Sequence, residues 1–181
     1  MIPLLETPRL ILREWRASDI EPFAALNRDP IVMLFFPHVL DQDQTLAYVE
    51  KTKNHFREHG IGKWAVELKE TSEFIGSVGL DTVDFDAPFN KAPEIGWRLA
   101  SHHWGKGYAT EAAAAAVTFM FEAEGCPEIV SFTAVQNKPS RRVMEKIGMT
   151  YDAGGDFDHP KLPVGHPLRR HVLYRIRNTS A

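Results

Sequence analysis

The sequence has few of the features that would place it in a disulfide-rich or membrane-bound class. Its 181 residues include a single cysteine, Cys126, which cannot form a disulfide within the chain. The longest apolar stretch, 112–121, is too short and too rich in alanine for a membrane span, and it suits a helix packed on a sheet. Residues 1–7 lack the basic-then-apolar order of a secretory signal. We therefore expect no membrane partner and a cytoplasmic location.

The sequence also lacks a strong excess of one charge. The net charge is −3, the pI is near 6.2, and there is no long run of Lys or Arg. A nucleic-acid partner needs a basic patch, so we predict none. Eight histidines are present, but His102 and His103 are adjacent, which predicts that they face different ways, and His159, His166 and His171 lack the spacing of a ligand set. We therefore predict no metal.

What is present is the composition of one folded domain. Hydrophobic residues make up 44% of the chain, which is enough for a core. No repeat, low-complexity tract or Gly/Ser linker divides the sequence, so we expect residues 1–181 to form a single domain. Residues 153–166 concentrate Gly, Pro, Asp and His, which predicts an irregular segment.

Periodicity and capping residues predict an alternation of strands and helices. The first helix should begin at Ser18 or Asp19, and the second should begin at Asp41 or Asp43 and end near Gly60. The expected strands are 9–14, 63–68, 74–81, 94–100 and 129–135 with two more at the end of the chain, and the remaining helices are about 107–124 and a segment that ends at 148. This order predicts an α+β, or mixed α/β, fold with a largely antiparallel sheet.

The most informative segment is residues 104–112, which read Trp-Gly-Lys-Gly-Tyr-Ala-Thr-Glu-Ala. Two glycines allow a tight turn that exposes successive N–H groups, and the helix that follows adds the partial positive charge of its N-terminus, so the segment predicts a phosphate site. The sequence matches neither a Walker loop nor a dinucleotide-binding fingerprint. A nucleotide-binding protein is therefore a weaker alternative.

The segment resembles the pyrophosphate loop of the GNAT N-acetyltransferases, Gln/Arg-x-x-Gly-x-Gly/Ala, with Trp104 in place of Gln or Arg. A second match is 137–149, which resembles the family's Asn-x-x-Ser segment and a helix that ends in Lys-x-Gly-Phe, with Met149 in place of Phe. Residues 7–13 and 172–176 resemble the first and last strands of the RimJ/RimL-like branch, the protein N-terminal acetyltransferases. The resemblance covers nearly the whole chain.

This resemblance implies a GNAT-like fold, with six to seven strands in a splayed sheet flanked by about four helices, and an acetyltransferase that uses acetyl-CoA. The pantetheine arm would pair with the strand at 94–100, and the pyrophosphate would meet the glycine loop. The implied cofactor-binding residues are Trp97, Arg98, Leu99, Trp104, Gly105, Lys106, Gly107, Tyr108, Ala109, Thr110 and Asn137. For Asn137, a turn residue at the end of a strand is the alternative.

In such an enzyme a neutral amine attacks the thioester directly, so the amine must lose its proton. An α-amino group with a pKa of about 7.7–8.0 needs less help than a lysine amine at about 10.4. Glu94 could relay this proton through water, and the alternative is an exposed glutamate at the start of a strand. Ser140 resembles the hydroxyl proposed to protonate the leaving thiolate, and a helix N-cap is the alternative.

Recognition of the acceptor is the least determined part. Phe35, Phe36, His38 and Trp64 could line a pocket for a peptide end or a small amine, although aromatic side chains are commonly core residues. A non-catalytic acyl-CoA-binding module is the second function class, because the catalytic pair is the less specific part of the match. The small size and the edge strands are compatible with a homodimer.

Overall fold

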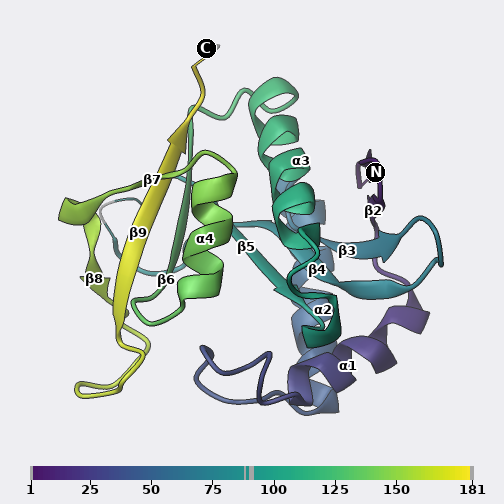
Figure 1. Cartoon of the computed structure of the whole chain (residues 1–181), viewed down its shortest axis with the longest axis horizontal. Helices are drawn as coiled ribbons and strands as arrows, with labels where there is room; N and C mark the ends of the chain where they lie inside the picture. The colour runs from purple at the N-terminus through teal and green to yellow at the C-terminus, as the bar shows by residue number, and fades with distance from the viewer. Residues whose placement is uncertain (1, 88, 90–91, 180–181) are drawn as a thin grey trace.

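The computed structural model describes residues 2–87, 89 and 92–179 of the chain. Within them lie four α-helices and a nine-stranded sheet (Figure 1). The helices are α1 (Ile20–Arg28), α2 (Gln42–His59), α3 (Tyr108–Glu122) and α4 (Lys138–Lys146). The strands are β1 (Leu5–Glu6), β2 (Leu10–Arg13), β3 (Lys63–Leu68), β4 (Phe74–Asp81), β5 (Glu94–Leu99), β6 (Glu128–Ala134), β7 (Thr150–Tyr151), β8 (Phe157–Asp158) and β9 (Arg170–Arg177).

The predicted fold class is confirmed, and the sheet has more strands than the six to seven expected. The order is β1-β2-β3-β4-β5-β6-β9-β7, with β8 also paired to β9. Every pairing is antiparallel except that of β5 with β6. The additional strands β1, β7 and β8 have two residues each, too few to show a period in the sequence.

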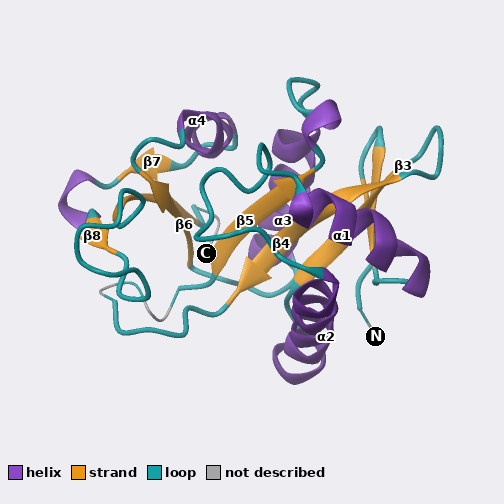
Figure 2. Ribbon diagram, turned by 90° about the horizontal axis from the view of Figure 1, so that it is seen from below, coloured by secondary structure: helices purple, strands orange, loops and turns teal. Residues whose placement is uncertain are grey.

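The helices cover both faces of the sheet. Figures 1 and 2 show α3 and α4 on one face and α2 on the other. The main core lies under α3, where Ala112, Ala113 and Ala116 are fully buried against the sheet. A second apolar cluster joins α1 and α2 to β3 through residues that include Phe23, Val49 and Ala65. The alanine-rich stretch of α3 is thus a packing surface, as its composition predicts.

Local signals in the sequence explain where the helices begin and end. The Asp41 carboxylate accepts the N–H of Gln44, so Asp41 is the N-cap of α2. Gly60 ends the same helix in a left-handed conformation (φ 72°) that glycine adopts without a steric penalty. Of the two caps that the sequence allows for this helix, Asp41 is the correct one.

The assignment of Trp64 to an acceptor pocket is wrong. Its side chain is fully buried, its indole N–H donates to the Pro3 carbonyl (2.8 Å), and its rings contact Phe56 and Phe119 edge-on. The alternation of β3 turns this residue to the face that α3 covers, while its neighbour Ala65 faces α1 and α2. Trp64 is therefore a core residue.

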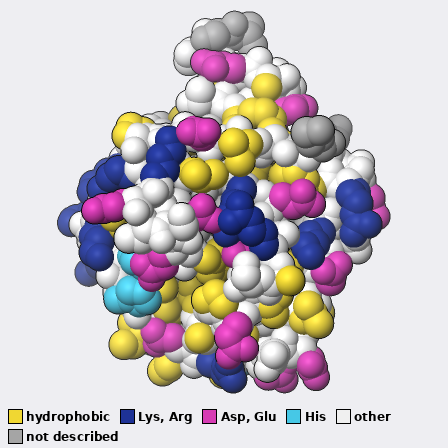
Figure 3. Space-filling view, turned by 90° about the vertical axis from the view of Figure 1, so that its right-hand side faces the viewer, with side chains coloured by type: hydrophobic (Ala, Val, Ile, Leu, Met, Phe, Trp, Pro, Cys, Tyr) yellow, Lys and Arg dark blue, Asp and Glu magenta, His cyan; other side chains and the backbone are white. Residues whose placement is uncertain are grey.

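The surface carries both signs of charge. On the face that Figure 3 shows, basic and acidic side chains lie interspersed among apolar ones. Among the described residues, no helix has the length and apolar character that a membrane crossing requires.

Candidate active site

The candidate active site begins where the sheet opens. β5 and β6 run parallel but share one register pair, Glu94 with Val130. The Val130 N–H also donates to the Pro93 carbonyl (3.0 Å), so the two strands are joined at their beginnings only. Figure 1 shows them separating from this point. The second half of β5 therefore has no strand partner on this edge among the described residues.

The register shows which backbone groups of β5 face this gap. The Ser131 hydroxyl donates to the Ile95 carbonyl (2.8 Å), so Ile95 faces β6. Successive residues of a strand direct their backbone groups to opposite edges, and therefore Trp97 and Leu99 face the gap as well. The N–H of Ala100, two residues after Arg98, donates to the Ile75 carbonyl of β4 (3.0 Å), so the backbone groups of Arg98 face β4 instead. Its backbone is thus not available to a ligand in the gap, and its assignment to the cofactor is corrected.

The glycine turn has the geometry that an anion site requires. Gly105 (φ 76°) and Gly107 (φ 84°) are both left-handed, and α3 begins directly afterwards at Tyr108. A Cβ at Gly105 would have no atom within 4 Å, and residues 104–107 are exposed. Since the first N–H groups of a helix have no partner within it, the donors of Tyr108 and its successors are available together with those of the turn.

Side-chain hydrogen bonds hold this turn in place. The Trp104 indole donates to the Leu99 carbonyl (2.8 Å), so the residue that departs from the family pattern joins the turn to β5. Arg9, next to β2, donates to the Lys106 carbonyl (3.0 Å) and pairs with Glu111 of α3 (2.6 Å). Sequence reasoning missed Arg9 and Glu111 because they lie 102 residues apart.

Asn137 and Ser140 occupy the first turn of α4. The Asn137 side chain accepts the Ser140 N–H (3.2 Å) and donates to the Thr133 hydroxyl (2.9 Å). Asn137 is therefore the N-cap of α4, and the alternative role of Ser140 as that cap is wrong. The Ser140 hydroxyl makes no hydrogen bond to any residue that the structure describes. An amide has two N–H donors, so one donor of Asn137 also remains for a ligand.

Glu94 lies among charged side chains at the start of β5. Lys63 Nζ is 2.7 Å from an Asp81 carboxylate oxygen and 4.0 Å from the Glu94 carboxylate. Only 17% of the Glu94 side chain is exposed, so it is not the freely solvated residue of the alternative interpretation.

The same surroundings shift the ionisation of the cluster. Burial raises the pKa of the Glu94 carboxyl; the Lys63 charge opposes this, and the Asp81 charge adds to it. Burial disfavours the charged form of Lys63, but the Tyr48, Glu94 and Asp81 charges outweigh it and raise the pKa of Lys63. Lys63 thus stays protonated, while Glu94 is a stronger base than a solvated carboxylate.

The aromatic residues between α1 and α2 occupy different environments. Phe36 is partly buried, with the Arg98 guanidinium 4.2 Å from its ring centroid. Phe35 is also partly buried, and His38 is exposed. Only Phe36 among the predicted acceptor residues is therefore placed against a polar group of β5.

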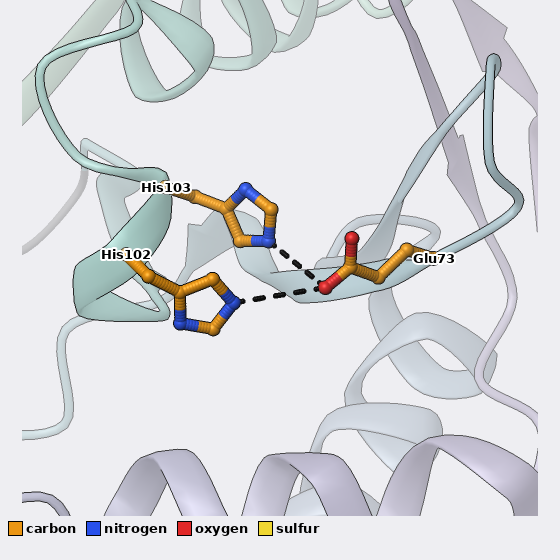
Figure 4. Close-up of side chains that lie close together, drawn as sticks. All are labelled: Glu73, His102 and His103. Carbon is orange, nitrogen blue, oxygen red and sulfur yellow. Dashed lines mark hydrogen bonds and ion pairs between the residues drawn. The ribbon is translucent and has the colours of Figure 1, made fainter.

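A histidine pair lies immediately before the glycine turn. Figure 4 shows His102 and His103 both directed at Glu73, with Nε2 to Oε1 distances of 3.6 Å and 3.1 Å. The expectation that the two rings face different ways is wrong, because they lie in a 3₁₀ turn, η2 (Ser101–His103), rather than in a strand. Hydrogen bonding from His103 lowers the pKa of Glu73.

These three side chains could offer ligand atoms within 4.8 Å of one another. A metal-binding histidine usually donates its second ring nitrogen to an acceptor, however, and the buried Nδ1 of His103 has no partner among the described residues. The cluster fits better as a link between the β3–β4 turn and η2. The absence of a metal stays a prediction.

The sequence and the fold both match known acetyltransferases. The acetyltransferase (GNAT) domain family matches residues 9–150. The uncharacterized N-acetyltransferase YnaD of Bacillus subtilis (strain 168) is 32% identical over 173 residues, 95% of each chain. The crystal structure of an acetyltransferase from Agrobacterium tumefaciens str. C58 superimposes with a TM-score of 0.78 at 30% identity, covering 98% of this chain and 95% of that one.

A RimL ribosomal L7/L12 α-N-protein acetyltransferase, solved in complex with coenzyme A, has the same fold, with a TM-score of 0.79 at 18% identity over 97% of this chain and 98% of that one. The chain belongs to the GNAT acetyltransferase family. It is an enzyme that transfers the acetyl group of acetyl-CoA to an amine.

Proposed function

We propose that the gap between β5 and β6, together with the glycine turn, is where this enzyme binds acetyl-CoA and acetylates a primary amine. One observation carries the proposal: an exposed turn of left-handed glycines leads into α3 beside β5, whose second half has no strand partner on the side of β6 among the described residues. A diphosphate needs several convergent N–H donors, and this turn offers them, while the Glu111 carboxylate of α3 is paired with Arg9. The residues therefore fit the cofactor.

Each end of the cofactor would meet a different part of the chain. The diphosphate would accept N–H bonds from residues 105–110, with Lys106 exposed to solvent. The amide groups of the pantetheine arm would pair with the free backbone edge at Trp97 and Leu99, as an added strand does. At Leu99 the N–H is the group available for this pairing, because the Leu99 carbonyl already accepts from Trp104.

The acetyl thioester supplies an electrophilic carbonyl and a thiolate that leaves easily. Glu94 would accept the proton of the incoming amine, directly or through one water, because its raised pKa suits a base near neutral pH. Lys63, which is paired with Asp81, lies 4.0 Å from this carboxylate. The Ser140 hydroxyl would donate a proton toward the leaving sulfur, since it is not used in the cap of α4.

The acceptor would be a primary amine that reaches β5 from the face covered by α1 and α2. Glu94 and Arg98 lie on this face, since Glu94 contacts Lys63 and Arg98 contacts α1. The RimL structure is named for acetylation of a protein N-terminus, and this chain has the same fold. A protein N-terminus and a small-molecule amine are both within the class, and a homodimer stays a prediction.

A thiol-release assay tests the proposal. Purified protein is mixed with acetyl-CoA and a panel of amino acids, polyamines and short peptides, and free CoA is followed with a thiol reagent. We expect amine-dependent release that falls at least tenfold in Glu94→Gln. Tight acetyl-CoA binding without release for every amine would contradict the assigned catalytic roles.

A further inference from the structure

Arg98 is a cation without an anionic partner. Its Nη1 donates to the Asn27 side-chain oxygen (2.7 Å), while its buried Nε has no partner among the described residues. No carboxylate of the described chain pairs with it. Burial lowers the pKa of this guanidinium.

The surroundings of Arg98 hold its position but do not neutralise it. Three aromatic rings surround the guanidinium carbon, with centroids 4.2 Å away for Phe36, 5.1 Å for Tyr48 and 5.9 Å for Phe23. Asn27, which accepts from Arg98, is itself fully buried and donates to the Thr45 hydroxyl (3.1 Å). A cation with a buried, unpartnered Nε and only neutral neighbours is costly unless a ligand completes its bonding.

The place of Arg98 on β5 connects this cation with the candidate chemistry. Residues 94, 96 and 98 point to the same face because strand side chains alternate. Gly96 lies between the other two, about 6.6 Å along the strand from each. A Cβ at Gly96 would lie 3.3 Å from a Glu94 carboxylate oxygen and 3.6 Å from Lys63 Nζ, so a side chain at this position would contact the proposed base and its cationic neighbour. All three residues are partly exposed.

We propose that Arg98 is the subsite for a carboxylate carried by the acceptor, so that the amine substrate is an amino-acid-like molecule or an acidic peptide end. A planar guanidinium and a carboxylate form paired charge-assisted hydrogen bonds, which would use the free Nε. The amine of such a molecule would then lie farther along the same face of β5, toward Glu94. This inference rests on the proposed function, because it needs the amine on this face of β5.

The test compares acceptors that differ only in the carboxylate. Rates are measured for α-amino acids and their carboxamides, and for dipeptides that begin with an acidic or a neutral residue. For each protein we take the ratio of kcat/KM for the amino acid to kcat/KM for its carboxamide. The ratio for the parent chain is then divided by the ratio for Arg98→Met, and this quotient is independent of the difference in amine pKa between the two acceptors. We expect this quotient to lie between roughly 10 and 100, the loss of a charge-assisted pair.

Two further variants separate recognition from structure. Asn27→Asp places an isosteric carboxylate against Arg98, so it should lower the ratio while leaving the melting temperature and acetyl-CoA affinity near those of the parent. Arg175→Met removes a partly buried strand arginine that already has carboxylate partners, Glu128 and Asp152, and should leave the ratio unchanged.

The outcomes distinguish the two proposals. An unchanged ratio in both Arg98→Met and Asn27→Asp, with amines still acetylated, overturns the carboxylate subsite and leaves the proposed function intact. Absence of turnover with every amine in the parent chain contradicts the proposed function and the inference with it. A lowered ratio in both variants supports the subsite, and the amino acid and dipeptide arms then identify which source of carboxylate is preferred.

Discussion

Substitution of Gly107 by alanine tests the glycine turn directly. This residue precedes α3 with φ at 84°, a conformation that costs a residue with a Cβ about 1–2 kcal/mol. The added Cβ would lie 3.4 Å from the end of the Arg9 side chain, which can move aside. We therefore expect Gly107→Ala to fold, with a melting temperature lower by about 2–4 °C for each kcal/mol lost.

The effect on acetyl-CoA should be larger than this strain suggests. A backbone that relaxes away from positive φ turns an N–H of the turn away from the diphosphate. A hydrogen bond to a charged group contributes about 1.5–3 kcal/mol, so the loss of one bond lowers the affinity by about tenfold to a hundredfold. Calorimetric titration with CoA measures this change.

Gly60 provides a matched control. It has φ at 72°, and a Cβ there would have no atom within 4 Å, but it ends α2, away from the glycine turn. Gly60→Ala should lose similar stability and keep its affinity for CoA. If Gly107→Ala binds CoA as tightly as Gly60→Ala does, the assignment of the diphosphate to this turn is refuted.

Five other substitutions test the remaining assignments. In the parent chain, kcat/KM should fall at acidic pH with an apparent pKa above the ordinary carboxyl range, because burial raises the pKa of Glu94. Glu94→Gln should remove this dependence of kcat/KM on pH, and its persistence in the variant would exclude Glu94 as the base. Asn137→Ala and Asp41→Ala each remove a helix N-cap, and each should lower the free energy of unfolding by about 1 kcal/mol. If Asn137 contacts the cofactor, Asn137→Ala should also weaken CoA binding, whereas Asp41→Ala should not. Equal CoA affinities of the two variants would exclude that contact. Trp64→Ala should destabilise the fold by about 3–5 kcal/mol in urea titrations without altering the relative rates of different amines, and an altered preference would return Trp64 to the acceptor site. Burial, followed by the His171 and Lys161 charges, lowers the pKa of His159 from 6.5 to about 4. Between these two pH values the unfolded chain binds a proton at His159 that the folded chain does not, so the free energy of unfolding should fall by about 1–2 kcal/mol as the pH drops from 6.5 toward 4. This loss should be smaller in His159→Gln, and the same dependence of stability on pH in both proteins would contradict the prediction.

Much of the fold could be predicted because its signals are local. The strand bounds 63–68 and 74–81 are confirmed, since a polar turn separates two apolar runs. The first turn of α4 contains Pro139, as predicted, because its fixed φ suits that position. The left-handed glycines of the turn were also predictable, since glycine spacing records backbone conformation directly.

The rest depends on contacts between distant parts of the chain. Whether Trp64 faces the core or a pocket is decided by which side of β3 the helix α3 covers, and a single strand does not contain that information. The same applies to Glu73 and its histidines, which meet only because the β3–β4 turn packs beside η2. The unpartnered state of Arg98 is likewise a property of the packed molecule, because only the fold shows which carboxylates fail to reach it.

The single bridge between β5 and β6 has a consequence for the lifetime of the protein. Because β5 and β6 are joined at one point, backbone N–H and C=O groups of β5 are left to pair with a bound acyl-CoA. The coenzyme would then stabilise the folded sheet as well as take part in the reaction. At a hundred times its dissociation constant, a ligand adds about 2.7 kcal/mol to the free energy of unfolding. Resistance to heat and to proteases would then follow the supply of acetyl-CoA, and the chain would be most vulnerable when that metabolite is scarce.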